Sequence, residues 1–77
     1  MRVTLATVAD VLFDGEAQSL NAPASEGDVT ILPNHVSLVT SLRKGTIKIT
    51  VGEGEEKTFP VENGVLEVNE KGATVLL

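Results

Sequence analysis

The side chains that could take part in catalysis are few, and His35 with Ser37 are the first candidates. A histidine base two positions from a serine would share its face of a strand, as a nucleophilic pair requires. However, no Gly-x-Ser-x-Gly elbow surrounds Ser37, and a pair on an exposed strand would lack an oxyanion hole. One histidine without any cysteine also cannot form a zinc site. We therefore interpret His35 as a surface, turn or interface residue, and we predict no catalytic residue, metal or cofactor.

Glu26 and Asp28 are the second candidate pair, because they flank Gly27 and would project to the same side of an extended chain. Paired carboxylates occur in glycoside hydrolases and in calcium sites. Calcium needs roughly six to eight oxygen ligands, and no EF-hand spacing accompanies this pair. A hydrolase would need a cleft that a chain of 77 residues cannot readily form. A solvated acidic turn and electrostatic docking against basic residues of another protein remain open.

Sites for phosphate groups are not expected. Gly52–Gly54 has the glycines of a phosphate-binding loop, but no helix is predicted after it, and Glu55 and Glu56 would repel phosphate. The net charge is −5, from six basic and eleven acidic side chains, and two phenylalanines are the only aromatic residues. The sequence therefore offers neither the basic stripe nor the aromatic stacking residues that bind nucleic acid. We predict no nucleotide or nucleic-acid site, and partners that carry basic patches.

The elements that must position these residues are predicted to be strands, because β-branched residues are abundant. Apolar and polar residues alternate over 46–51 and again over 57–61, with a glycine-rich, acidic hairpin tip between the two runs. Pro60 cannot donate a ladder hydrogen bond, so the return strand is expected to lie at a sheet edge or to carry a bulge there. Further short strands are predicted at 2–5, 11–13, 65–68 and 73–77.

A helix competes with a strand only between Asn34 and Leu42. The apolar residues there fit a short helical stripe with Asn34 as its N-cap, but they also alternate as a strand would. A helix of about nine residues is marginal, so we favour a strand. Asn63 and Gly64 are expected to supply positive φ for a tight turn. Turn signals about every 8 to 12 residues indicate a sandwich or a barrel.

Targeting and membrane segments are not predicted. No stretch approaches the roughly 20 apolar residues that cross a bilayer. The first residues also lack the apolar core of a signal peptide. The absence of cysteine leaves the compartment open, and we expect residues 1–77 to form one domain.

The stretch from Ala22 to Gly45 is the most distinctive part of the chain. It resembles the signature of the epsilon subunit of F-type ATP synthases, which typically reads A-P-G-x-x-G-x-F-G-I-L-P-x-H-A-P-L-L-T-x-L-x-P-G. Residues 12–16 resemble the early V-F-x-G-E of that family, and the end of the chain resembles its closing G-F-L-E-V and V-T-V-L. Ala24 departs from the pattern, because it replaces a family glycine at the acidic loop.

The resemblance implies an all-β fold, a small antiparallel β-sandwich of about ten short strands, jelly-roll-like. It implies a non-catalytic rotor subunit in the central stalk of the proton-translocating F-type ATP synthase. Such a subunit binds the gamma subunit and the ring of c subunits, and so couples ring rotation to ATP synthesis. Membrane association would come only through the complex, on the cytoplasmic face of a bacterial inner membrane or on the matrix or stroma side in an organelle. The C-terminal two-helix hairpin usual in this family is not expected after Leu77.

Individual positions carry over from the resemblance one at a time. Glu26 and Asp28 match the acidic loop that meets the c ring. His35 and Thr40 match the signature histidine and threonine near the gamma-facing surface. Thr7, at the end of the first predicted strand, falls where the family also approaches gamma.

The residues alone leave one other class of function open. An unrelated β-sandwich adaptor would use an exposed edge strand, such as the one near Pro60, to pair with a partner peptide. Selection of extended peptides from a library, instead of binding to a helical shaft, would favour such an adaptor over a rotor subunit.

Overall fold

The computed structural model describes residues 1–34 and 37–77, and this part of the chain contains nine strands and one 3-10 turn. The elements are β1 (Arg2–Ala6), β2 (Val11–Glu16), β3 (Ser19–Ala24), β4 (Gly27–Ile31), β5 (Leu38–Leu42), β6 (Gly45–Thr50), η1 (Gly52–Gly54), β7 (Glu56–Val61), β8 (Gly64–Asn69) and β9 (Gly72–Leu76). The predicted all-β class is confirmed, with nine strands in place of about ten. The preference for a strand before Leu42 is also confirmed, by β5. The described residues include no helix that is long and apolar enough to pass through a membrane.

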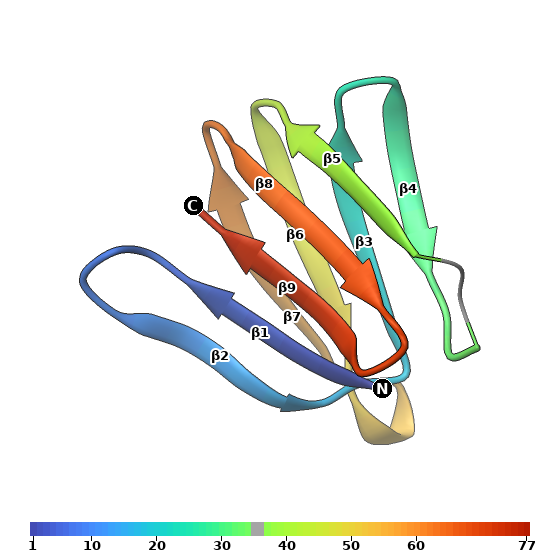
Figure 1. Ribbon diagram of the computed structural model, residues 1–77. Helices are drawn as coiled ribbons and strands as arrows, with labels where there is room; N and C mark the ends of the chain where they lie inside the picture. The colour runs from blue at the N-terminus through green and yellow to red at the C-terminus, as the bar shows by residue number, and fades with distance from the viewer. Residues whose placement is uncertain (35–36) are drawn as a thin grey trace.

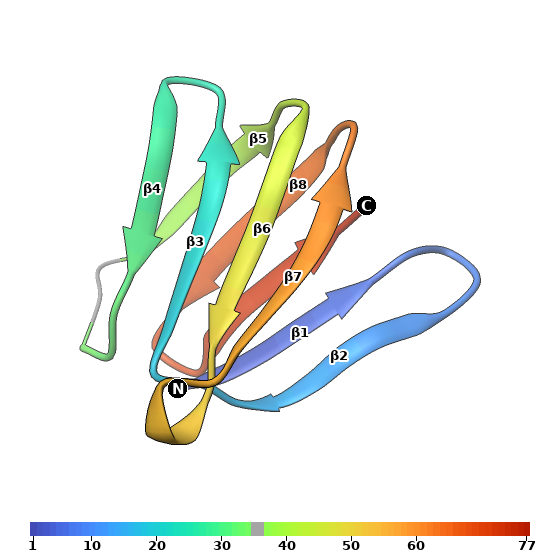
Figure 2. The ribbon, with the colours of Figure 1, turned by 180° about the vertical axis from the view of Figure 1, so that it is seen from behind.

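The strands form two packed layers (Figures 1 and 2). Hydrogen bonds connect them in the order β2-β1-β9-β8-β5-β3-β6-β7, with β4 on the other side of β3. The link between β5 and β3 is a single residue pair, Ala24 with Leu42, and the sheet folds over at this point. We call β2, β1, β9, β8 and β5 the front sheet, and β4, β3, β6 and β7 the back sheet. This arrangement is the predicted β-sandwich.

The predicted hairpin of 46–51 and 57–61 is confirmed as β6 and β7, which pair in antiparallel register. β7 ends the order of strands, so Pro60 lies at a sheet edge as predicted. All neighbouring strands are antiparallel except one pair: β1 and β9 are parallel, with Arg2 beside Gly72 and Ala6 beside Leu76. Sequence periodicity did not reveal this parallel pair, which joins the two ends of the chain.

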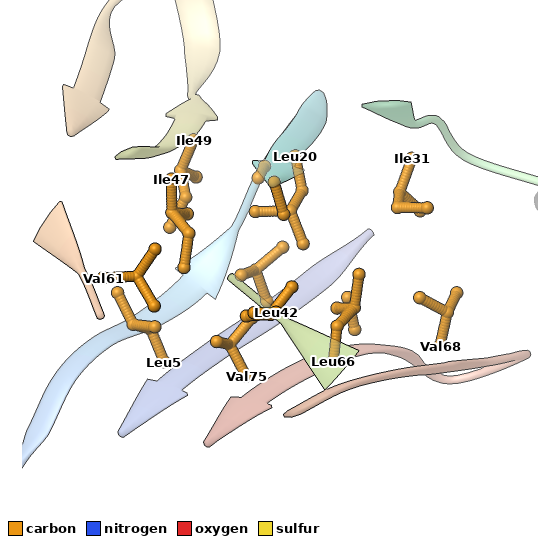
Figure 3. Close-up of a cluster of buried hydrophobic side chains, with 14 residues drawn as sticks. Leu5, Leu20, Ile31, Leu42, Ile47, Ile49, Val61, Leu66, Val68 and Val75 are labelled. Carbon is orange, nitrogen blue, oxygen red and sulfur yellow. The ribbon is translucent and has the colours of Figure 1, made fainter. Parts of the chain in front are cut away.

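The core lies between the two sheets (Figure 3). Inward-facing residues of the front sheet meet those of the back sheet, and the alternation of buried and exposed residues along each strand produces this layer. The fully buried large side chains are Val3, Leu5, Leu66, Val68 and Val75 in the front sheet, and Leu20, Ile47 and Ile49 in the back sheet. The rings of Phe13 and Phe59 meet edge to face, with centroids 6.5 Å apart, and connect β2 to β7.

The turn at Asn63 and Gly64 differs from the prediction, because neither residue has a positive φ. Glycine is required there for a different reason: a β-carbon on Gly64 would lie 2.5 Å from the carbonyl oxygen of Leu76. The close approach of β9 therefore excludes a side chain at this position. Positive φ occurs at other turns, among them the one between β8 and β9, where φ of Gly72 is 145°.

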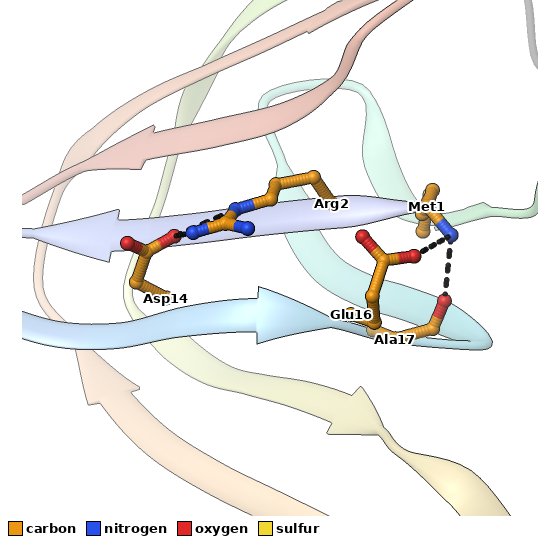
Figure 4. Close-up of polar contacts among 5 residues, drawn as sticks. All are labelled: Met1, Arg2, Asp14, Glu16 and Ala17. Atoms are coloured by element: carbon orange, nitrogen blue, oxygen red, sulfur yellow. Dashed lines mark hydrogen bonds and ion pairs between the residues drawn. The ribbon is translucent and has the colours of Figure 1, made fainter.

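Polar contacts of two residues, Met1 and Arg2, fix the start of β1 (Figure 4). The Met1 amine donates a hydrogen bond to the carbonyl oxygen of Ala17 at 3.0 Å and lies 3.5 Å from a carboxylate oxygen of Glu16. The guanidinium of Arg2 donates to Asp14 across the β1–β2 ladder, with Nη2 2.9 Å from Oδ1. β1 is thus held by β2 through side chains as well as through the backbone.

Candidate functional site

The first candidate surface is the acidic turn, residues 25–28, which joins β3 to β4. Ala24 and Gly27 close the turn as the last pair of the ladder, and φ of Gly27 is 128°. Most residues avoid that backbone conformation, so the glycine between the two acids has a conformational role. Glu26 and Asp28 are both exposed, and their carboxylates are available to a partner.

The acidic turn is tied to the connection between β5 and β6. Ser25 N–H donates to the carbonyl oxygen of Ser41 at 2.9 Å, and Arg43 N–H donates to that of Pro23 at 2.9 Å. The Nε of Arg43 also donates to the carbonyl oxygen of Ala24 at 3.0 Å. The turn is therefore held in place by backbone and side-chain hydrogen bonds with the β5–β6 side.

Replacing Arg43 with alanine should lower the free energy of unfolding by about 1 kcal/mol, because a partly buried carbonyl loses its charged donor. Urea denaturation of the purified chain measures this change. Lys44→Ala is the matched control, since Lys44 is an exposed neighbouring cation for which the described residues show no hydrogen bond or ion pair. Equal stability of the two variants would show that the contact to Ala24 contributes nothing.

Thr40 lies against the acidic turn and not on the open face of the front sheet. It pairs with the buried Leu66 and therefore points to the core side of β5. Its Oγ1 is 3.4 Å from the Oγ of Ser25, which is the residue before Glu26. The structure thus places Thr40 beside the acidic turn, through Ser25, although the sequence assigned Thr40 and the acids of this turn to different partners.

Thr7 lies at the opposite side of the molecule, in the connection between β1 and β2 (Figures 1 and 2). Its Oγ1 accepts hydrogen bonds from the backbone N–H groups of Ala9 at 3.2 Å and Asp10 at 3.1 Å. Its hydroxyl therefore organises the hairpin turn. His35, the remaining residue of the predicted gamma contact, lies outside the described residues.

The second candidate surface is an apolar row on the outer face of the front sheet. The strand registers place four side chains side by side across β8, β9, β1 and β2: Val65, Leu76, Ala6 and Val11. Of these, Val65 is 43%, Leu76 55% and Val11 65% exposed. Val39 of β5, 68% exposed, lies on the same face beside the row. Contiguous exposed apolar side chains of this kind mark an interaction site.

Sequence reasoning did not find the apolar row. Alternation within 64–69 shows that Val65 and Leu66 face opposite sides, which is a local signal. The row itself depends on the pairing of β9 with both β8 and β1. No local pattern specifies that pairing, so these residues could be grouped only once the register was known.

Polar side chains occupy the next row of the same face. From β8 to β2 they follow the order Glu67, Thr74, Thr4 and Asp14, and the apolar Val39 of β5 lies beside Glu67 at the end of this row. Beyond them an open hollow of about 210 Å³ is lined by Arg2, Thr4, Asn69, Lys71, Gly72, Ala73 and Thr74. No three acidic or histidine side chains in the described ranges could share a metal ion.

Comparison with known proteins shows the family to which this chain belongs. The family described as "ATP synthase, Delta/Epsilon chain, beta-sandwich domain" matches residues 1–77, and the chain belongs to this family. The "ATP synthase epsilon chain" of Alkalilimnicola ehrlichii is 40% identical over 76 residues, covering 99% of this chain and 54% of that protein. That of Halorhodospira halophila is 42% identical over 77 residues, covering 99% and 55%. The chain spans about half the length of the curated relatives it matches.

Solved structures share the fold. A chain in the Euglena gracilis mitochondrial ATP synthase structure, of OSCP, F1 and c-ring, has a TM-score of 0.88 at 20% identity, covering 96% of this chain and 48% of that chain. One in the central stalk and c-ring of the Tetrahymena thermophila mitochondrial ATP synthase has a TM-score of 0.81 at 18% identity, covering 99% and 61%. The family match and the shared fold favour the epsilon-type domain over an unrelated adaptor.

Proposed function

We propose that this chain is the β-sandwich of a non-catalytic rotor subunit in the central stalk of a proton-translocating F-type ATP synthase. The observation that supports this most directly is membership of the Delta/Epsilon β-sandwich family over residues 1–77. A rotor part that passes motion from one component to another needs two contact surfaces on a stiff body. The acidic turn and the apolar row supply two such surfaces on a two-layered sandwich.

The gamma subunit is the proposed occupant of the outer face of the front sheet. Thr7 and the strand of Thr40 lie beyond the two ends of the apolar row, so the row lies between the residues that the resemblance assigns to gamma. Apolar side chains at the centre of an interface exclude water and supply most of its affinity. We therefore add Val65, Leu76 and Val11 to the proposed gamma contact of His35, Thr40 and Thr7. Because Thr40 points to the core side of β5, it would meet gamma only at the rim of this contact, beside Ser25.

The c ring is the proposed partner of the acidic turn. Exposed carboxylates at Glu26 and Asp28 attract basic or polar loops and orient them more than they add affinity. The hydrogen bonds from Ser25 and Arg43 support this role, because a turn that transmits force must keep its shape. The subunit would then be peripheral to the membrane, held there by the complex, on the cytoplasmic side in a bacterium.

Calorimetric titration of this chain into the gamma subunit from the same source tests the proposal. We expect saturable binding with one chain per gamma, in solution and without membrane. The absence of heat with a gamma subunit that is folded by circular dichroism would contradict the rotor assignment.

Reversing both charges of the acidic turn, Glu26→Lys with Asp28→Lys, should weaken binding to the purified c ring by about tenfold at low salt and leave the affinity for gamma unchanged. Surface-plasmon measurements on immobilised c ring and on immobilised gamma separate the two effects. Glu53→Lys with Glu70→Lys is the matched control, since both acids are exposed at the opposite end of the sandwich (Figure 1). Equal losses at the two partners would remove the acidic turn from the c-ring contact.

A further inference from the structure

Glu67 holds an unusual place on the outer face of the front sheet. It lies on β8 between Val39 of β5 and Thr74 of β9, and Val65 of the apolar row precedes it on the same face. Its side chain is exposed. A carboxylate therefore lies next to two exposed apolar residues of this surface, Val39 and Val65.

The other carboxylates of the outer face already have cationic partners. Asp14 is 2.9 Å from Nη2 of Arg2, and Glu16 is 3.5 Å from the Met1 amine (Figure 4). Within residues 1–34 and 37–77, Glu67 has no ion pair and no side-chain hydrogen bond. Water is its solvating partner while the face is open.

A partner that covers the apolar row also removes water from Glu67. A carboxylate that loses water without gaining a partner opposes binding strongly, whereas one that meets a cation and further donors does not. Apolar contacts are non-directional, so the row alone would accept a partner in several positions. A single charge beside the row removes that freedom, because only one placement brings opposite charges together.

We propose that Glu67 is a specificity-determining residue of the front sheet. The surface of gamma that binds this face would be an apolar patch with one lysine or arginine placed opposite the Glu67 carboxylate. The inference rests on the proposed function, in which gamma is the occupant of this face. Beyond that function, it assigns a chemistry to the surface of gamma that meets this face, and it names Glu67 as the residue that fixes how gamma is oriented.

Titrations of gamma with the unmodified chain, Glu67→Gln and Glu67→Lys test the proposal. We expect affinity to fall by about tenfold for Glu67→Gln, which leaves the cation of gamma unpaired, and by more than about 100-fold for Glu67→Lys, which opposes it. The salt dependence of the affinity should also be smaller for Glu67→Gln. Glu56→Lys is the matched control, because it reverses an exposed charge on the back sheet.

Four outcomes separate this inference from the proposed function. The absence of binding by the unmodified chain would contradict gamma as the partner, and the inference would fall with it. Binding by the unmodified chain together with equal affinities for Glu67→Lys and Glu56→Lys would overturn the inference alone. An unfolded Glu67→Lys variant, detected by circular dichroism, would leave the decision to Glu67→Gln, which keeps the shape of the side chain. In a charge swap, a gamma variant with one interface lysine changed to glutamate would be titrated with the Glu67→Lys variant. Recovery of affinity in this combination would support the pairing of Glu67 with that lysine directly.

Discussion

Replacing Gly72 with alanine should lower the free energy of unfolding by about 3 kcal/mol, a large share of the roughly 4 to 12 kcal/mol expected for a domain of this size. Two causes act together. The φ of 145° is a conformation that side chains rarely adopt, and a β-carbon there would overlap the carbonyl oxygen of Arg2. Relief of the overlap would require β1 and β9 to move apart, which breaks the parallel ladder between them.

Thermal denaturation measures the effect of Gly72→Ala, which should lower the midpoint by more than about 10 °C. Gly52→Ala provides the matched control, since a β-carbon on Gly52 meets no atom within 4 Å and its φ needs no glycine. Midpoints of the two variants within about 1 °C of each other would show that the β1–β9 contact is not constrained as described.

Replacing Val65 with lysine should weaken binding to gamma by more than about 100-fold, because a charge then enters the centre of the apolar contact. The lysine would also lie two residues from Glu67 on the same face, where it would draw that carboxylate away from the cation of the partner. Val65 is 43% exposed, so its replacement leaves the core between the sheets intact. Calorimetric titration with gamma measures the change.

Thr58→Lys is the control for Val65→Lys, because Thr58 is an exposed residue of β7 at the far edge of the back sheet. It adds the same charge to the molecule without touching the front sheet. An affinity for gamma that falls equally in both variants would point to net charge, and an unchanged affinity in Val65→Lys would remove the apolar row from the interface.

The hairpin of β6 and β7 and the strand character of β5 were predictable, because their signals are local. Alternation over 46–51 and the position of Pro60 depend only on neighbours in the sequence. The prediction for Gly64 was wrong in its reason: the residue is a glycine because Leu76 approaches it, and that approach is a tertiary contact. Local turn chemistry and close packing select the same residue type, so sequence alone does not distinguish them.

The candidate surfaces were predictable only in part. Glu26 and Asp28 could be found because they are close in the sequence, on either side of Gly27, and both are exposed. The apolar row and the exposed position of Glu67 among apolar neighbours depend on five strands being in register. Period-2 alternation assigns a residue to one of the two faces of its strand. The pairing of strands then decides which residues of different strands lie side by side on that face.

The parallel pairing of β1 with β9 also affects how the chain reaches its native state. Within the front sheet, β2 is hydrogen-bonded to β1 alone, and the other neighbour of β1 is β9. The amino-terminal hairpin therefore joins the front sheet only after β9 has been synthesised, and Val3 and Leu5 lack part of their native cover until then. Contacts between distant parts of a sequence have a high loop-closure entropy, and all-β folds of this kind complete in about milliseconds to seconds. During translation the nascent hairpin is a site where chaperones or other chains would bind before the fold is complete.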